Sequence, residues 1–482
     1  MTEETERTQT EQTVTEQAQR KPADKNDFSQ GSIAKTILRL GIPITVAQLV
    51  NVLYNIVDRM YIGHLPGGGG TALTALGICL PVTMIVTAFS RLLGEGGAPR
   101  FSYERGRGDN EEAARVLGNA VFLLLTGGVL LTVFGIAFLE PILYLFGATD
   151  LTIGYALPYC RIYLTGSVFV MLALGLNHYI NSQGYAKIGM LTVAIGAALN
   201  IALDPLFIYV FDMGVSGAAL ATVISQFVSA LWVMLFLTGK KAPIRIQLKY
   251  MRPVPRIIGV IMSMGLAGFV MQLNNSLVST VINRTLLAVG SDLYIGLQTC
   301  ISSVREVVFM PINGITSAAQ PILGFNYGAN RPDRVRKTAR LMLIFTLSYN
   351  LVVFALLQLF PGAFIGLFTD DAGILALGSM PFHVYYAAYF MMSFQMTGQT
   401  VYVGLGKSKQ AIFYSLLRKA IIVVPLTILL PHTGLGVYGV FAAEPISDVL
   451  GGGICWLSMY FSVYRKLPAD PPQAALGEAE RG

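Results

Sequence analysis

Long apolar stretches alternate with short polar connections through almost the whole chain. Twelve stretches are long enough to cross a membrane as helices, since about 20 apolar residues span the hydrocarbon. Their cores lie near 42–62, 72–92, 116–139, 157–180, 188–211, 216–238, 257–288, 293–323, 340–368, 374–402, 410–431 and 436–463. The pattern predicts an all-α integral membrane protein with twelve transmembrane helices.

The last six stretches repeat the first six at a spacing of about 222 residues. The recurring pairs include Pro99 and Pro321, Gly106 and Gly328, Gly184 and Gly406, and Lys187 and Lys409. The first stretch aligns with the seventh at a spacing of 224, which pairs Gly41, Gln48 and Asn51 with Gly265, Gln272 and Asn275. Because six is an even number, both halves enter the membrane from the same side. This predicts two six-helix bundles related by an axis along the membrane normal, as in parallel-repeat transporters.

Composition and charge agree with a membrane protein. Mean hydropathy is +0.59, and 13% of the residues are charged, about half the fraction usual in soluble chains. The net charge of +7 is not gathered into a nucleic-acid-binding patch, because the basic residues fall in alternate connections, mainly around 100–115, 240–256 and 331–340. Cytoplasmic loops carry such an excess of Lys and Arg, so both termini are expected in the cytoplasm and the chain in the cell membrane.

The expected organisation follows from these boundaries. Residues 1–35 form a disordered cytoplasmic tail with no signal peptide, since residues 1–30 lack an apolar core. Residues 36–239 form an N-terminal six-helix lobe, 240–256 a basic cytoplasmic linker, 257–466 a C-terminal six-helix lobe, and 467–482 a second cytoplasmic tail.

Two acids interrupt apolar stretches of the first half. Asp58 lies on one helical face with Gln48, Asn51 and Asn55, and Asp204 follows Asn200 by four residues and precedes Pro205. A carboxylate at bilayer depth costs a few kcal/mol and by default marks an ion, proton or substrate site. Counting from the outer connections, Asp58, Asp204 and Thr222 all lie roughly 9 to 15 Å inside the membrane. One shared site can therefore contain all three side chains.

These groups suit a cation. Two carboxylates, an amide and a hydroxyl are oxygen ligands for a hard cation such as Na⁺, and two close carboxylates can also share a proton. The simpler alternative is a capped helix kink with amides bonded to neighbouring helices. The repeat argues against that alternative, because Asp58, Asn200 and Asp204 align with Ile282, Ile422 and Leu426. The fold itself does not need the polar groups.

The second half offers weaker candidates. Glu444 aligns with Thr222 and lies four residues before Asp448, so these acids form an alternative proton or drug-attracting pair, or simply support the kink at Pro445. Aromatic, thioether and amide groups gather in the tenth stretch, where they either line a drug cavity or pack the bundle. The candidate cavity residues over both halves are Gln48, Asn51, Asn55, Glu306, Tyr389, Gln395, Met396 and Gln399.

An enzyme is not expected. Gly404-x-Gly406-Lys407-Ser408 resembles the end of a phosphate-binding loop, but Val401 stands where that loop requires glycine. The four histidines and four cysteines have no metal-binding or redox spacing, and no nucleophile elbow occurs. We therefore expect no catalytic residues and no cofactor beyond a coupling ion.

The stretches LGIPITVAQLVNVLYNIVDRMYIG, LNIALDPLFIYVFDMGVSGAALATVIS and QPILGFNYGANRPDRVRKTAR resemble the multidrug and toxic compound extrusion (MATE) family, in its bacterial drug-exporting branch. The resemblance covers nearly all twelve stretches. It implies a cation site in the N-terminal lobe, at positions that Asp58, Asn200, Asp204 and Thr222 match. Another branch uses acids of helices 7 and 10, but here the seventh stretch offers Asn274 and Asn275, and the tenth has no acid.

The resemblance implies a secondary active multidrug efflux antiporter that exports organic cations and drugs in exchange for Na⁺ or H⁺ by alternating access. The expected partners are small organic cations and the lipid bilayer, with no nucleic acid and a monomeric state. A lipid-linked oligosaccharide or polysaccharide flippase of the same superfamily is the alternative function. An integral membrane enzyme is the alternative of a different class, and it requires a catalytic cluster that the sequence does not show.

Overall fold

The computed structural model describes residues 26–65, 69–369 and 372–468, and these residues contain helices and no strands. The first half contains α2 (Ile33–Gly63), α3 (Gly69–Leu93), η1 (Glu95–Gly97), α4 (Ala98–Gly106), α5 (Asn110–Ala137), α6 (Leu139–Leu145), α7 (Ile153–Thr165), α8 (Ser167–Ser182), α9 (Ala186–Pro205), the π-helical turn η2 (Leu206–Val210) and α10 (Gly214–Thr238). The turn η3 (Leu248–Tyr250) lies in the connection between the halves.

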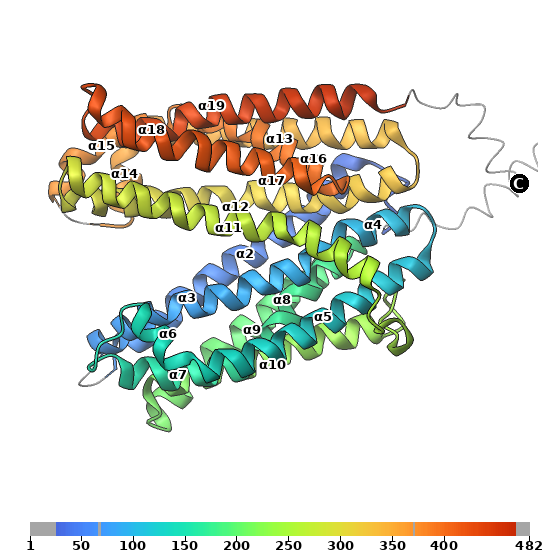
Figure 1. The fold of residues 1–482 in the computed structure, drawn as a ribbon, viewed down its shortest axis with the longest axis horizontal. Helices are drawn as coiled ribbons and strands as arrows, with labels where there is room; N and C mark the ends of the chain where they lie inside the picture. The colour runs from blue at the N-terminus through green and yellow to red at the C-terminus, as the bar shows by residue number, and fades with distance from the viewer. Residues whose placement is uncertain (1–25, 66–68, 370–371, 469–482) are drawn as a thin grey trace, which may run out of the picture.

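The second half contains α11 (Pro255–Val289), α12 (Asp292–Gly328), α13 (Pro332–Leu359), α14 (Pro361–Gly366), α15 (Ala372–Tyr386), η4 (Tyr389–Met391), α16 (Met392–Gly404), α17 (Ser408–Leu416), the π-helical segment η5 (Leu417–Val423), α18 (Val424–Leu429), η6 (Leu430–Thr433), α19 (Val437–Ser462) and η7 (Tyr464–Lys466). Figure 1 shows the two halves as separate bundles, blue to green and yellow to red.

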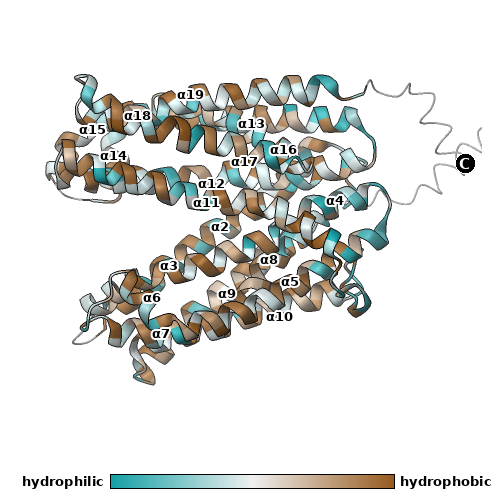
Figure 2. Ribbon diagram, in the orientation of Figure 1, coloured by the Kyte–Doolittle hydropathy of each residue, from teal (hydrophilic) through white to brown (hydrophobic). Residues whose placement is uncertain are grey.

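The helices account for the twelve predicted spans. Within the described residues, nine helical segments are long and apolar enough to cross a membrane, and the pair α7 and α8, bent by 55°, makes up to ten. The other two spans are α12, which carries Arg305 and Glu306 in its middle, and the broken pair α15 and α16. Figure 2 shows hydrophobic residues along the middle of the helices and hydrophilic residues near the end where α4 lies.

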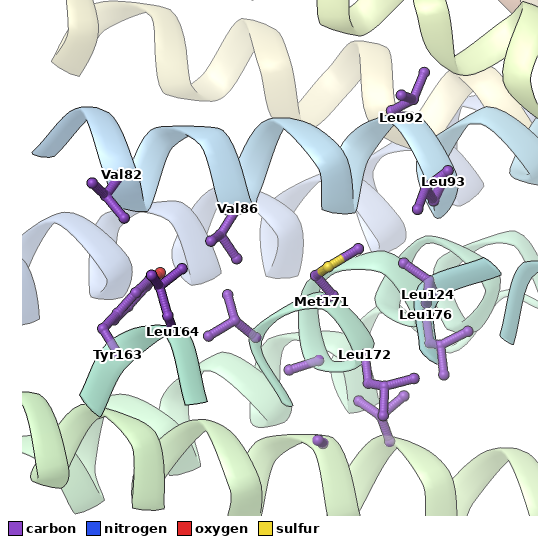
Figure 3. Packing of buried hydrophobic residues seen from close by; sticks show 14 of the residues in the cluster. Val82, Val86, Leu92, Leu93, Leu124, Tyr163, Leu164, Met171, Leu172 and Leu176 are labelled. Carbon is purple, nitrogen blue, oxygen red and sulfur yellow. The ribbon is translucent and has the colours of Figure 1, made fainter. Parts of the chain in front are cut away.

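Each half has its own hydrophobic core. In the first half, side chains of α3, α5, α7 and α8 interlock, among them Val86, Leu124, Leu164 and Met171 (Figure 3). A second cluster, around Phe382, Tyr386 and Phe441, lies in the C-terminal half. These two clusters lie mainly within one bundle each, and a smaller cluster that includes Ile37 and Ile322 joins the two halves.

The halves touch at one end of the bundle. We call it the basic end, because the connections at 107–109, 239–254 and 329–331, which lie in or beside the regions rich in Lys and Arg, are found there. Gly41 packs against the backbone of Gly314, and a Cβ at Gly106 would overlap the carbonyl oxygen of Phe325. From these contacts the ribbons of the two halves diverge toward the opposite end, where α6 and α14 lie (Figure 1). The structure is therefore closed at the basic end.

Part of the predicted N-terminal tail belongs to this closure. Residues 1–25 lie outside the described residues, but α2 begins at Ile33 and Phe28 is buried against Phe325, with ring centroids 5.6 Å apart. Arg334 donates from Nη2 to the carbonyl oxygen of Phe28 at 2.9 Å. The prediction of a disordered tail up to residue 35 is therefore wrong for residues 26–35. The segment 467–482 is described only at Leu467 and Pro468.

The connection at 240–256 is also held to the first half. Ile244 donates its backbone N–H to Gln183 Oε1 at 2.9 Å, and Val254 donates to Asn119 Oδ1 at 2.8 Å. Asn119 in turn donates to the carbonyl oxygen of Tyr250 at 3.3 Å. Buried side-chain amides therefore fix the path of this linker, and α11 begins at Pro255.

Candidate cation site and the opposing charge cluster

The structure brings together the four side chains of the predicted cation site. We call Asp58, Asn200, Asp204 and Thr222 the N-half cluster. Asn200 Nδ2 lies 3.2 Å from Asp204 Oδ1 and 3.3 Å from Thr222 Oγ1. The carboxyl group of Asp58 on α2 lies near that of Asp204, close enough for the two groups to interact electrostatically. Helices α2, α9 and α10 therefore meet at one buried polar site.

The local sequence explains this arrangement. Asn200 and Asp204 are four residues apart, so their side chains lie one above the other on one face of α9. Pro205 directly follows the acid and α9 passes there into the π-helical turn η2. Proline removes a backbone donor and π-helical turns often occur at functional sites. The helix thus loosens directly beside Asp204.

Three oxygen atoms of the cluster have no donor among the described residues. Asp58 Oδ1, Asn200 Oδ1 and Asp204 Oδ2 are buried and lack a hydrogen-bond partner. Asp204 is 0% exposed and Asp58 is 9% exposed. Buried acceptors normally have a partner, and two adjacent carboxylates repel each other unless a positive charge lies between them. The group therefore fits a proton or a small hard cation.

A small cavity adjoins the cluster. Its volume is about 30 Å³, above the roughly 10 to 15 Å³ that one water molecule requires. The polar lining consists of Asn51, Tyr54, Thr192, Asn200, Thr222, Ser225, Gln226 and Ser229. Most of these groups lie on the basic-end side of Asp204 along α9 and α10. About two water molecules can therefore fit beside the cluster in that direction.

The other predicted cavity residues do not form one surface. On α2, Asn51 and Asn55 are exposed, and Gln48 Oε1 accepts from Asn313 Nδ2 of the second half at 3.3 Å. Glu306 is exposed on α12. In contrast, Tyr389, Gln395 and Gln399 are 5% exposed or less.

The two glutamines are occupied by contacts inside the second half. Gln395 Nε2 donates to Gln399 Oε1 at 3.5 Å, and Gln399 Nε2 lies 3.0 Å from the sulfur of Met271. Met396 packs beside the core of the second half. In this conformation, the tenth span therefore contributes to packing and presents no open aromatic surface at these residues.

The second half contains a buried group of charges that the sequence analysis recognised only in part. We call Arg305, Arg418, Lys419, Glu444 and Asp448 the C-half charge cluster. Lys419 Nζ lies 2.7 Å from Glu444 Oε1 and Arg418 Nη1 lies 2.6 Å from Asp448 Oδ1. Arg305 also binds Glu444 and donates to Tyr385 Oη at 2.7 Å.

The predicted acid pair Glu444 and Asp448 therefore already has cationic partners within the protein. Three cations face two acids in the cluster, which leaves one formal positive charge. Arg418 and Lys419 were missed, although two adjacent basic residues inside the apolar stretch 410–431 were a visible signal. Basic residues at this depth usually pair with acids, which Glu444 and Asp448 supply.

The two clusters occupy equivalent places in the repeat. At the spacing of 222 residues, Arg418, Lys419, Glu444 and Asp448 correspond to Gly196, Ala197, Thr222 and Gln226. All four counterparts line the small cavity of the first half. In the second half, charged side chains therefore fill the position that a cavity occupies in the first half. The oxygen-rich acid site lies in the first half.

Comparisons with known proteins agree with this architecture. A family model described as MatE matches residues 43–206 and 257–429. The multidrug export protein MepA of Staphylococcus saprophyticus is 25% identical over 442 residues, which cover 91% of this chain and 95% of that protein. Another MepA, from Staphylococcus haemolyticus, is 22% identical over 94% of this chain and 98% of that protein. A solved outward-facing structure of a multidrug resistance MATE transporter has a TM-score of 0.85 at 25% identity and covers 92% of this chain and 100% of that chain.

Proposed function

The chain belongs to the MATE family of membrane transporters, and from this premise we propose that it is a secondary multidrug antiporter that exports organic cations in exchange for Na⁺ or H⁺. The N-half cluster is the observation that carries the proposal. Three of its buried oxygen atoms lack donors within the described part of the chain, and its two carboxyl groups are neighbours. A coupling ion supplies the positive charge that these groups lack.

The direction of transport follows from the basic connections. The positive-inside rule assigns the basic end to the cytoplasm. The halves touch there and diverge toward the opposite end (Figure 1), so we assign this conformation to the outward-facing state. In this state, Na⁺ or H⁺ enters from outside and binds between Asp58 and Asp204. Rocking of the two halves then opens the basic end.

Coupling requires that the ion and the drug favour different states. A ligand shifts a conformational equilibrium only by its difference in affinity for the two states. One charge moving down about 100 mV supplies roughly 2.3 kcal/mol, and one pH unit supplies about 1.4 kcal/mol. Together these energies correspond to several hundredfold in the electrochemical gradient of the exported compound. The proton or sodium gradient is therefore sufficient for drug export without nucleotide hydrolysis.

The substrate class rests on the relatives and on charge. The MepA proteins are multidrug exporters by name, and this chain presents the acidic Glu306 on an exposed face of α12. An exposed carboxylate at membrane depth attracts organic cations. We propose lipophilic cationic dyes and drugs as substrates.

Dye efflux from cells tests the proposal. We expect Asp58→Asn and Asp204→Asn to abolish ion-driven efflux of a cationic dye at normal surface abundance. Glu140→Gln, which changes an exposed acid on α6, is the matched control and keeps efflux. Efflux at the wild-type rate in both aspartate variants excludes the N-half cluster as the coupling site. If purified protein moves a labelled lipid-linked glycan but no dye, the protein is a flippase instead.

A further inference from the structure

We propose that the basic end carries a binding site for a phosphate group, formed jointly by the two halves. A cavity of about 340 Å³ lies at their junction, within the roughly 300 to 1,000 Å³ of small-molecule sites. The first half supplies Tyr103 and Arg107 at the end of α4. The second half supplies Tyr327, Gly328, Asn330, Arg331, Pro332, Leu467 and Pro468.

The charge of this basic-end cavity favours an anion. Its lining contains two arginines, and no acid is found among the described residues that line it. Arg107 Nη1 lies 3.4 Å from Glu104 Oε2, but Glu104 is also bound by Arg100. Arg331 Nε is buried without a hydrogen-bond acceptor among the described residues, and the Asp333 carboxylate lies 3.9 Å away.

Both guanidinium groups therefore retain donors for a ligand. Arginine presents parallel N–H groups that match two oxygens of a phosphate. The side chain of Arg107 is 52% exposed and that of Arg331 is 33% exposed, so a ligand in the cavity can reach them. Two arginines from opposite halves can thus bind one phosphate.

The remaining wall suits an amphipathic ligand. The rings of Tyr103 and Tyr327 lie 5.9 Å apart, and Leu467 and Pro468 add apolar surface. Arg336 donates from Nη2 to the carbonyl oxygens of Leu467 and Pro468 at 2.7 and 2.8 Å. These carbonyl groups are therefore already bonded, which reduces their repulsion of an anion.

The position favours the headgroup of an anionic lipid as the source of the phosphate. The cavity lies where α4 and α12 end, at the basic end, which the proposed orientation assigns to the cytoplasmic surface of the membrane. Basic pockets between helices on the cytoplasmic side bind anionic headgroups. Free inorganic phosphate offers the same chemistry and is the second source.

The site depends on the conformation of the protein. Tyr103 and Arg107 face Tyr327 and Arg331 only while the two halves meet at the basic end, where a Cβ at Gly328 would overlap the carbonyl oxygen of Tyr103. A ligand that binds one conformation shifts the equilibrium toward it. A bound phosphate group therefore holds the basic end closed.

Binding is tested by calorimetry on the full-length protein in a maltoside detergent. The probes are dihexanoyl phosphatidylglycerol and inorganic phosphate, each titrated separately. We expect the Arg107→Gln/Arg331→Gln double variant to bind the lipid about 30-fold more weakly, as two removed surface cations imply. Arg115→Gln, which changes an exposed arginine on α5 outside the cavity lining, keeps wild-type affinity. The Arg107→Lys/Arg331→Lys variant keeps the charge but loses the parallel N–H groups. We expect its affinity for the lipid to lie between that of the wild type and that of the Arg107→Gln/Arg331→Gln variant.

Two outcomes of this titration distinguish the sources. Binding of the lipid alone identifies a headgroup site, and binding of inorganic phosphate with a similar dependence on the two arginines identifies a free-phosphate site. Either result supports the proposal. If wild-type protein binds neither probe, or if the folded double variant binds as the wild type does, the proposal is overturned.

The conformational effect is measured by electron paramagnetic resonance between spin labels at Asn110→Cys and Lys337→Cys. These positions are exposed on opposite halves, and the four native cysteines are buried. We expect the bound probe to increase the short-distance population in the wild-type background and to leave the double variant unchanged. An increase of equal size in both proteins contradicts the site.

Discussion

Arg418 and Gly196 occupy equivalent positions of the two repeats, but Arg418 fills its position with a charged side chain and Gly196 leaves its position open. Arg418 places its guanidinium 2.6 Å from Asp448, whereas Gly196 leaves room for a polar cavity beside Asn200 and Thr222. One duplicated scaffold thus contains a charge-filled site and an open site. This asymmetry motivates the assignment of ion coupling to the first half.

The C-half charge cluster predicts a loss of stability on removal of one cation. We expect Lys419→Ala to destabilise the protein by about 1.5 to 3 kcal/mol, the usual contribution of a hydrogen bond to a charged group, because Arg305 and Arg418 still compensate the charge of Glu444. Thermal unfolding of the detergent-solubilised protein measures the effect. Lys409→Ala, at an exposed position of the same span, is the control. Equal unfolding temperatures of Lys419→Ala and the control contradict the prediction.

Thr222→Val tests the hydroxyl of the N-half cluster. It removes the acceptor that lies 3.3 Å from Asn200 Nδ2 and one oxygen ligand for a metal ion. We expect about tenfold weaker Na⁺ binding, the effect of one lost polar contact to a charged group. Sodium-dependent thermal stabilisation measures this affinity. Thr238→Val is the control, since its hydroxyl donates to backbone carbonyl oxygens of its own helix. If sodium stabilises Thr222→Val at the same concentrations as the wild type, the hydroxyl of Thr222 is not a ligand of the ion.

Gly106→Ala tests the closure of the basic end. The added Cβ overlaps the carbonyl oxygen of Phe325, so we expect a shift of the population toward an open basic end. Spin labels on the two halves report this shift as a longer distance. Gly259→Ala on α11 adds a methyl group where nothing lies within 4 Å and leaves the distance unchanged. A wild-type distance distribution for Gly106→Ala shows that this contact does not control closure.

Phe28→Ala tests the N-terminal contact at the same end. Phe28 is 1% exposed and packs with residues of α2 and α12. Truncation of a buried phenylalanine removes about 3 to 5 kcal/mol of packing, and we expect this loss mainly in the closed state. The spin-label distances between the halves measure the shift away from the closed state, and the unfolding temperature measures the loss of stability. Phe134→Ala, at an exposed position of α5, is the control and changes neither readout.

The twelve spans and the two-bundle arrangement could be predicted from the sequence, because apolar length and an internal repeat are visible in one dimension. The N-half cluster could be proposed because Asp58 and Asp204 are isolated acids in apolar stretches. The pairing of Arg418 with Asp448 could not be assigned in this way, since the two residues are 30 positions apart on different helices. The burial of Phe28 depends on a contact with Phe325, almost 300 residues away.

Ion-driven dye transport into proteoliposomes of defined orientation tests the central claim most directly. A sodium or proton gradient is imposed across wild-type, Asp58→Asn and Asp204→Asn protein reconstituted at equal density. We expect the gradient to drive dye transport in the wild type and to drive none in either variant, while both variants remain folded. Gradient-driven transport by Asp204→Asn at the wild-type rate would contradict the assignment of ion coupling to the N-half cluster.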